Sequence, residues 1–143
     1  MQHEEILKHL FKQYFKEDCL AVIQLPQAGS DRIYFRLKGA GNSAIATYGK
    51  DTKENETFIH HTKHFHQKFI TVPQVYIASE DKKYYLQEDL GDSSLYSIIK
   101  QEGISENVIK HLKEVLQQLT YLQIRGAEHF NFATCYPIQE FNR

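Results

Sequence analysis

The chain of 143 residues has little that would mark a membrane, secreted or nucleic-acid-binding protein. No apolar run approaches the length of a membrane-spanning helix, and the N-terminus is polar and amphipathic where a secretory signal would be continuously apolar. The formal net charge is −1, so no global attraction to nucleic acid or to an anionic membrane is expected. These absences predict a cytoplasmic protein that binds neither nucleic acid nor membranes.

Cysteine is scarce as well. The two cysteines, Cys19 and Cys135, match no metal-binding or redox spacing, so both are expected to be buried, reduced thiols. Low-complexity tracts and internal repeats are also lacking, and apolar residues at 41% with charged residues at 24% are typical of soluble globular proteins. The length is sufficient for one domain with a substantial core.

The spacing of apolar residues predicts the order helix, three strands, helix, two strands, then helices. The two hairpin turns among the first three strands indicate an antiparallel meander, and two more strands bring the sheet to five. Asp51 is expected to cap the second helix, whose aromatic face, from Phe58 to Phe69, should point toward the sheet. Asp92 is expected to cap a short helix that Gly103 ends, and Ser105 to start the last helix, which is apolar on a broad face. The predicted ranges are helix 3–16, strands 19–25, 33–38 and 44–48, helix 53–69, strands 74–78 and 83–87, and helices from 92 and 105 onward.

A short turn lies between the first two predicted strands. It contains Gly29, Ser30 and Asp31, and Arg32 follows directly. Such a turn exposes backbone N–H groups, and a guanidinium beside them can hold an oxyanion such as phosphate. The same composition is typical of an ordinary solvent-exposed turn, and Arg32 could equally form a surface salt bridge.

Three segments, taken in order, resemble the aminoglycoside and choline phosphotransferase family of protein-kinase-like enzymes. QAGSDRIYFRL, residues 27–37, is similar to the family's phosphate-covering hairpin. FIHHTKHFHQKFITVPQVYIAS, residues 58–79, resembles its helix, Val-Pro turn and fourth strand, and YYLQEDLGDSSLYSII, residues 84–99, resembles its hinge. The nearest branch is the bacterial kinases that phosphorylate N-acetylmuramate or N-acetylglucosamine at the anomeric carbon.

The resemblance implies an α+β fold: a protein-kinase-like N-terminal lobe with a five-stranded antiparallel sheet, an N-terminal helix and a C-helix, followed by the hinge and the first helices of the C-lobe. It implies a nucleotide-binding lobe at 1–90 and an incomplete C-lobe at 91–143, with ATP and Mg²⁺ as ligands of the intact protein and the connector backbone contacting adenine. The residues implied to contact the nucleotide are Gly29, Ser30, Asp31, Arg32, Ala46, Gln87, Glu88, Asp89 and Leu90.

The chain departs from the family at the third strand. Kinase-like enzymes generally place a lysine there to hold the α- and β-phosphates, but residues 44–48 read AIATY. The sugar-kinase branch also dispenses with that lysine. Arg32 and Lys50 are the candidate substitutes, and Glu54 and Glu56 occupy the region of the glutamate that would pair with the lysine.

The family's catalytic loop and metal-binding aspartate belong to the large lobe. No His-Gly-Asp loop follows the hinge, and no aspartate follows Asp92. We therefore expect no catalytic residue and no metal ligand here. The chain is expected to be the nucleotide-binding lobe of an ATP-dependent phosphotransferase for a sugar or amino sugar, in a truncated or fragment form that is inactive alone. The alternative is a non-catalytic, pseudokinase-like regulatory or protein-interaction module.

Two further groups of residues leave alternatives open. The second helix carries a cluster of histidines, which either faces solvent or holds a metal ion. The cluster comprises His60, His61, His64 and His66. The C-terminal aromatic residues either fold back over the last helix or are left uncovered and promote self-association. They are Tyr121, Phe130, Phe132, Tyr136 and Phe141.

Overall fold

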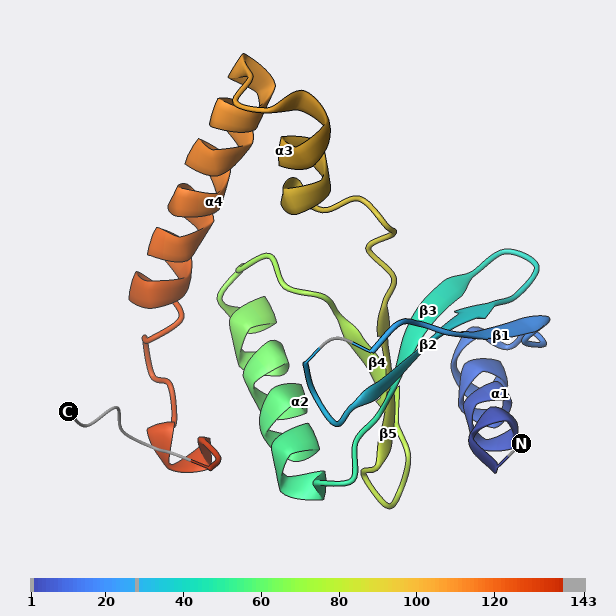
Figure 1. Cartoon of the computed structure of the whole chain (residues 1–143). Helices are drawn as coiled ribbons and strands as arrows, with labels where there is room; N and C mark the ends of the chain where they lie inside the picture. The colour runs from blue at the N-terminus through green and yellow to red at the C-terminus, as the bar shows by residue number, and fades with distance from the viewer. Residues whose placement is uncertain (1, 28, 138–143) are drawn as a thin grey trace. The chain divides into compact units, whose positions relative to one another are not determined.

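Figure 1 shows the fold in the computed structural model, which describes residues 2–27 and 29–137. The elements are α1 (Gln2–Phe15), β1 (Ala21–Gln24), β2 (Ile33–Lys38), β3 (Ser43–Tyr48), α2 (Thr52–Gln67), β4 (Val75–Ala78), β5 (Tyr84–Glu88), α3 (Leu95–Glu102), α4 (Glu106–Ile124) and the one-turn 3₁₀ helix η1 (Phe132–Thr134). The predicted order of helices and strands is confirmed. The sequence did not predict η1, because a single turn leaves no apolar periodicity.

The described residues divide into two compact units. The first takes in the described parts of Met1–Lys63, Pro73–Asp89 and Asn131–Arg143, and the second takes in His64–Val72 and Leu90–Phe130. The expected boundary after residue 90 falls beside the division between Asp89 and Leu90. Residues 64–72 group with the second unit and residues 131–137 with the first, because contacts rather than chain order define the units.

The first unit is built on one five-stranded antiparallel sheet in the order β1-β2-β3-β5-β4. The predicted meander of the first three strands is confirmed by the β1–β2 and β2–β3 pairings. β4 and β5 then form a second antiparallel pair that adds to β3 through β5, with one irregularity near Val75.

α1 covers one face of this sheet (Figure 1). Its apolar residues Leu7, Leu10 and Phe11 are buried, as the helical spacing predicts. They pack on strand residues that alternate along the chain and therefore share a face. The strand residues of this core are Phe35, Leu37, Ala44, Ala46, Tyr84 and Leu86.

α2 lies on the other side of the sheet from α1 (Figure 1). The predicted cap is confirmed, since the Asp51 carboxylate accepts hydrogen bonds from the backbone N–H groups of Lys53 and Glu54 at 3.0 and 3.1 Å. Phe58 stacks on Tyr85 of the sheet with ring centroids 5.3 Å apart. The expectation that Phe69 also faces the sheet is wrong: it follows the helix end in a left-handed conformation and is 90% exposed.

Asn55 fixes the start of α2 to two loops of the first unit. It is fully buried, and its Nδ2 donates to the carbonyl oxygens of Gly49 and Lys82, each at 2.9 Å. A Cβ at Gly49 would clash with Asn55 Oδ1. Glycine at position 49 thus permits the close approach that this amide requires.

We predict that Asn55→Ala lowers the free energy of unfolding by about 3 kcal/mol, because two buried carbonyl groups lose their donor. Chemical denaturation monitored by circular dichroism measures the change. Lys63→Ala, at an exposed position of the same helix, is the matched control and should have little effect. Equal stability of the two variants would contradict the role of Asn55.

Glu17 joins the chain after α1 to the turn between β2 and β3. Its carboxylate accepts hydrogen bonds from the side chain of Asn42 at 2.9 Å and from the backbone N–H groups of Asn42 and Gly41 at 3.0 and 3.2 Å. The Asn42 side chain, followed by these backbone donors, lowers the pKa of Glu17 below its ordinary value. The charged form is therefore favoured by folding.

A group with a lowered pKa in the folded state contributes stability above its unfolded pKa and loses it as the pH falls through the folded value. We predict that Glu17→Gln is less stable than the wild type at pH 6, and that the difference disappears as the pH falls below about 4. Denaturation curves of both proteins across this range provide the test. A difference that stays constant with pH would contradict it.

The second unit contains α3 and α4. Ser94 caps α3 in a reciprocal capping box with Ser97, so the predicted cap Asp92 is wrong. Gly103 ends α3 with φ 67°, and Ser105 caps α4, as predicted. Ser94 is itself in an extended conformation, with φ −122° and ψ 154°, and the helix begins at Leu95 directly after it.

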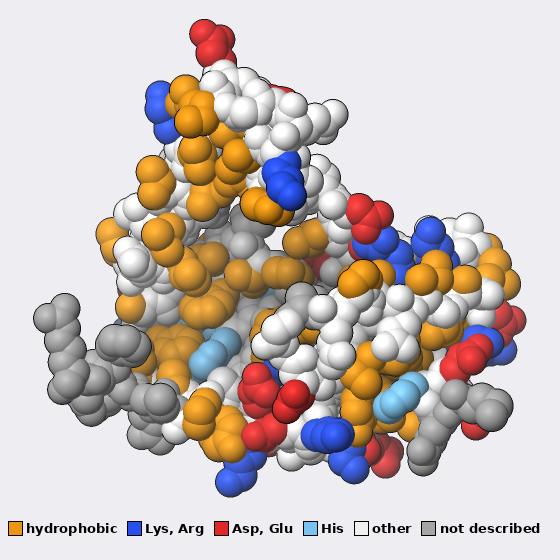
Figure 2. All heavy atoms as spheres, in the orientation of Figure 1, with side chains coloured by type: hydrophobic (Ala, Val, Ile, Leu, Met, Phe, Trp, Pro, Cys, Tyr) orange, Lys and Arg blue, Asp and Glu red, His pale blue; other side chains and the backbone are white. Residues whose placement is uncertain are grey.

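α4 carries apolar side chains that remain largely exposed, and Figure 2 shows them along this helix. Val108 alone among the described residues of α4 is buried. The exposed ones are Ile109, Leu112, Val115, Leu116, Leu119 and Ile124. None of the helices in the described residues is long and apolar enough to cross a membrane.

Among the C-terminal aromatic residues, Phe130 stacks on Phe65 with centroids 5.8 Å apart, within the second unit. Phe132 and Tyr136 are exposed, while Tyr121 is half-buried under the Arg125 guanidinium. Phe141 lies outside the described residues. Phe130 is therefore packed against the end of α2, whereas the expected fold-back was over the last helix. The self-association alternative stays a prediction for the exposed rings.

Candidate functional site

The sheet face opposite α1 carries a row of side chains that crosses four strands. The strand register aligns Ile23 with Arg36, Arg36 with Ile45, and Ile45 with Gln87. Because neighbouring residues along a strand point to opposite faces, this row points away from the core under α1. Within this row, Ile45 lies between two polar side chains, Arg36 and Gln87.

Arg36 is fixed by a bidentate ion pair with Asp89, the residue that follows β5. Its Nη2 lies 3.0 Å from Asp89 Oδ1, and its Nε lies 2.8 Å from Asp89 Oδ2. The two side chains are only 13% and 8% exposed. The pair therefore ties the second strand to the start of the connector, through one hydrogen bond from Nη2 and a second close charge contact at Nε.

We predict that Asp89→Asn or Arg36→Ala alone lowers the free energy of unfolding by about 3 to 5 kcal/mol, because each leaves the partner buried without its counter-charge. The double substitution Arg36→Met with Asp89→Leu should recover much of this loss. Lys12→Met removes an exposed pair with Asp18 and should cost less than about 1 kcal/mol. Single variants as stable as the Lys12→Met control would contradict this role.

Arg32, just before β2, is held against α2. Its Nη2 lies 3.3 Å from Glu54 Oε1, and the guanidinium carbon lies 5.6 Å from the Phe58 ring centroid. The Arg32 side chain is largely buried, and its Nε makes no hydrogen bond to any residue that the structure describes. A guanidinium offers fixed N–H donors of the kind that can hold an anionic ligand.

The neighbouring turn places its residues at the surface. Gly29 adopts φ 63°, in the left-handed region that glycine tolerates best, and a Cβ there would meet nothing within 4 Å. The Ser30 hydroxyl oxygen accepts the Arg32 backbone N–H at 3.1 Å, which removes that N–H as a phosphate donor. Asp31 is exposed, and its carboxylate offers no donor to a phosphate.

Lys50 was the other candidate to replace the third-strand lysine, and Glu56 the other candidate for the paired glutamate. These two residues do not come together in this region. Lys50 is exposed, and Glu56 lines a different hollow with His60 and residues 133–136. Of the two candidate cations and two candidate carboxylates, only Arg32 and Glu54 form a pair. The sequence could name all four but could not choose among them, because the choice depends on how α2 packs on the sheet.

Ala46 does not lie on the site face. Its side chain is fully buried in the core under α1, so it cannot contact a ligand on the opposite face. Ile45 and Thr47, its neighbours in β3, point to that face. Their alternation in β3 is visible in the sequence, but which face α1 covers is not.

Part of the hydrogen-bonding capacity of the connector after β5 is already used by Gln74, which precedes β4. The Glu88 backbone N–H donates to Gln74 O at 2.8 Å, and the Glu88 carboxylate accepts from Gln74 N at 3.2 Å. That N–H cannot also donate to a nucleobase. Leu90, the last predicted contact, is 67% exposed and begins the second unit.

Gln87 is the one predicted contact of β5 that is still unpaired. Its Oε1 is buried and accepts no hydrogen bond from the residues that the structure describes. Nearby in the same unit, Tyr85 is almost fully buried beside Phe58, and this burial raises the pKa of its hydroxyl. The face therefore combines a buried cation, a buried ion pair and an unpaired acceptor around apolar and aromatic groups.

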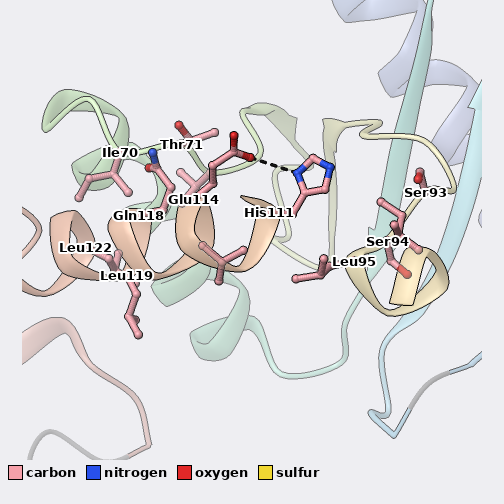
Figure 3. A pocket seen from close by; sticks show the side chains of 13 residues that line it. Ile70, Thr71, Ser93, Ser94, Leu95, His111, Glu114, Gln118, Leu119 and Leu122 are labelled. Atoms are coloured by element: carbon pink, nitrogen blue, oxygen red, sulfur yellow. Dashed lines mark hydrogen bonds and ion pairs between the residues drawn. The ribbon is translucent and has the colours of Figure 1, made fainter. Parts of the chain in front are cut away.

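A separate cavity of about 460 Å³ lies within the second unit (Figure 3). Its lining is mostly apolar and includes Leu95, Leu119 and Leu122, with the His111–Glu114 pair of α4 at 3.1 Å beside them. None of the residues predicted to bind nucleotide lines it. The apolar spacing of α4 predicted a broad apolar face, but the segment that meets it was not readable from sequence.

The histidines of α2 are spread over different surroundings. His64 Nε2 donates to Gly126 O at 2.9 Å, and His61 Nε2 lies 3.9 Å from Cys135 Sγ. His60 and His66 are exposed. Across residues 2–27 and 29–137, no three His, Cys, Asp or Glu side chains gather in a way that could hold a metal ion. Cys19 and Cys135 are free thiols and are both half-buried.

Compared with models of protein families and with curated proteins, the chain matches none.

Proposed function

We propose that this chain is the nucleotide-binding lobe of an ATP-dependent phosphotransferase for a small molecule, with a sugar or amino sugar as acceptor. The observation that carries the proposal is the Arg32–Glu54 pair beside the turn between β1 and β2, on the sheet face opposite α1. It sets a buried cation, anchored by a carboxylate of α2, next to the turn that resembles a phosphate-covering hairpin.

Arg32 takes the role that a third-strand lysine has in kinase-like enzymes. The third strand presents Thr47 on this face, so the strand itself supplies no positive charge. Arginine holds phosphate well because its planar guanidinium offers several fixed N–H donors. Glu54 and the Phe58 ring orient that guanidinium.

The chain's own residues fit the triphosphate better than they fit a metal ion. Hard cations such as Mg²⁺ prefer oxygen ligands, chiefly carboxylates. The described carboxylates near this face are engaged: Glu54 with Arg32, and Asp89 with Arg36. Mg²⁺ would therefore come bound to the phosphates, where it neutralises charge. In this proposal the base and the metal-binding aspartate belong to the family's large lobe, and this chain alone has no turnover.

We predict that the chain binds Mg²⁺–ATP and that Arg32→Ala weakens binding about tenfold or more, because a charge-assisted contact to phosphate is lost. Lys50→Ala is the matched control: it removes the other candidate cation and should leave the Kd unchanged. Isothermal titration calorimetry measures both, and the thermal shift with Mg²⁺–ATP checks the result independently.

Two results would count against the proposal. One is the absence of heat and of thermal shift at millimolar Mg²⁺–ATP with a folded protein. The other is a loss of affinity in Lys50→Ala with none in Arg32→Ala, which would assign the phosphate contact to Lys50 instead of Arg32. Circular dichroism of each variant separates lost binding from lost folding.

A non-catalytic, pseudokinase-like module is the second candidate, favoured by Thr47 in place of the strand lysine. Such a module would use the same lobe to bind a protein partner. Sugar phosphorylation by a longer product of the same gene would exclude it. Nucleotide binding alone would not, because the two candidates differ in turnover rather than in the nucleotide pocket.

A further inference from the structure

We propose that Cys135 is a modification site, at which the thiol forms a mixed disulfide with a small compound of the glutathione type, and that His61 takes the proton of the thiol. The cysteine follows η1, and the histidine lies in α2. The inference does not rest on the proposed function, because none of the residues proposed to contact nucleotide takes part in it.

Cys135 and His61 are brought together by the packing of the segment after residue 130 on α2. Cys135 Sγ lies 3.9 Å from His61 Nε2, within the hydrogen-bonding reach of a sulfur atom. Both residues belong to the first unit, although they are 74 positions apart in the chain. A thiol beside an imidazole is the arrangement in which a base activates a cysteine nucleophile.

The neighbouring hydroxyl group does not compete with the thiol as a donor to His61. Thr134 Oγ1 lies 3.5 Å from His61 Nε2, but it donates its single proton to Asn131 O at 2.7 Å. Of these two neighbours, therefore, only the Cys135 thiol can donate to an unprotonated Nε2. Once His61 has taken the proton, its N–H can donate to the thiolate and to Thr134 Oγ1.

The position of Cys135 is held by contacts of the residues on both sides of it. Thr57 of α2 donates a hydrogen bond to Thr134 O at 3.2 Å. After the cysteine, the Tyr136 side chain forms a hydrogen bond with the carboxylate of Asp51, which caps α2. The chain is thus attached to α2 or to its cap before and after Cys135, and the thiol is kept close to the imidazole.

A cavity of about 440 Å³ gives access to this thiol. Cys135 is half-buried and lines the cavity, and cavities of this size commonly hold small molecules. The other ionisable side chains of the lining are Lys53, Glu56 and His60 of α2, and Tyr136. A small disulfide can therefore reach the sulfur past a wall that carries charges of both signs.

The charges of this wall match a compound of the glutathione type. At neutral pH glutathione carries two carboxylates and one ammonium group. Lys53 and a protonated His60 can meet the carboxylates, and Glu56 can meet the ammonium group. Complementary charges of this kind favour one reagent over an uncharged disulfide.

The reaction is a thiol–disulfide exchange. The Cys135 sulfur attacks one sulfur of glutathione disulfide while its proton passes to His61 Nε2. A new S–S bond forms between Cys135 and one glutathione, and the S–S bond of the reagent breaks. The second glutathione leaves as a thiolate and takes a proton from His61 or from water. Cys135 is oxidised, the departing glutathione is reduced, and no further oxidant is needed.

Cys19 provides an internal control in the same chain. It is also half-buried, and its Sγ donates to Ala21 O at 3.3 Å. Burial raises the pKa of its thiol above the ordinary value, so little thiolate is present at neutral pH. We therefore expect the two thiols to react at different rates.

The experiment incubates the full chain with glutathione disulfide at pH 7 and follows the mass of the intact protein, with peptide mapping to locate the adduct. We expect one glutathionyl group on Cys135, formed about tenfold faster than any adduct on Cys19. Cys19→Ser should react like the wild type, and Cys135→Ser should gain no adduct over the same time. Dithiothreitol should release the adduct.

Two further variants test the neighbours of the thiol. His61→Gln should slow the reaction about three- to tenfold at pH 7, and the difference should vanish above about pH 10, where a thiol ionises without a base. Lys53→Ala should slow it about twofold with glutathione disulfide but not with uncharged bis(2-hydroxyethyl) disulfide. Lys63→Ala, at an exposed position of α2 outside the cavity lining, is the matched control and should change neither rate.

No adduct on the folded wild type, or an adduct on Cys19 in place of Cys135, overturns the inference. Mapping of the wild type gives this result even where a variant fails to fold, and circular dichroism checks each variant. Equal rates of His61→Gln and the wild type at pH 7 overturn the role of His61 as base. An equal response of Lys53→Ala to the two disulfides overturns the preference for a compound of the glutathione type.

Discussion

The structure depends on the fact that a β-sheet has two faces and that side chains alternate between them. α1 covers one face and takes up its apolar residues, which makes Phe35, Leu37, Ala46 and Leu86 core. The residues between them must point the other way. These include Arg36, Thr47 and Gln87, whose polar groups would be costly under α1. The face that carries the proposed site is thus the complement of the core face, set by the same alternation.

Two arginines only four residues apart have different roles because each meets a different carboxylate. Arg36 lies in the strand and pairs with Asp89, so its charge is neutralised where a strand meets the connector. Arg32 lies before the strand and reaches Glu54 on α2, whose carboxylate is half-exposed. The first pair holds structure together, since breaking a buried pair is costly. The second joins the segment before β2 to α2 and keeps the Arg32 guanidinium beside the turn between β1 and β2.

Position in the fold also explains how an arginine could replace a lysine at a distance in sequence. A third-strand lysine would project from the position of Thr47, which faces Tyr34 across the β2–β3 register. Arg32 lies two residues before Tyr34, just ahead of β2, and its guanidinium reaches Glu54 of α2. In the proposed function, Arg32 supplies from this neighbouring segment the positive charge that β3 lacks.

The sequence by itself determined the order of elements, the meander, the Asp51 and Ser105 caps and the end of α3 at Gly103, because these depend on local periodicity and on residues with special backbone preferences. It also brought together Gly29, Ser30 and Arg32, which are neighbours in the chain. Only the tertiary structure decided that Ala46 is core while Gln87 is not, since alternation fixes two sets of residues but not which set α1 covers. It alone chose Glu54 over Glu56 and Arg32 over Lys50, because that pairing depends on how α2 is rotated against the sheet.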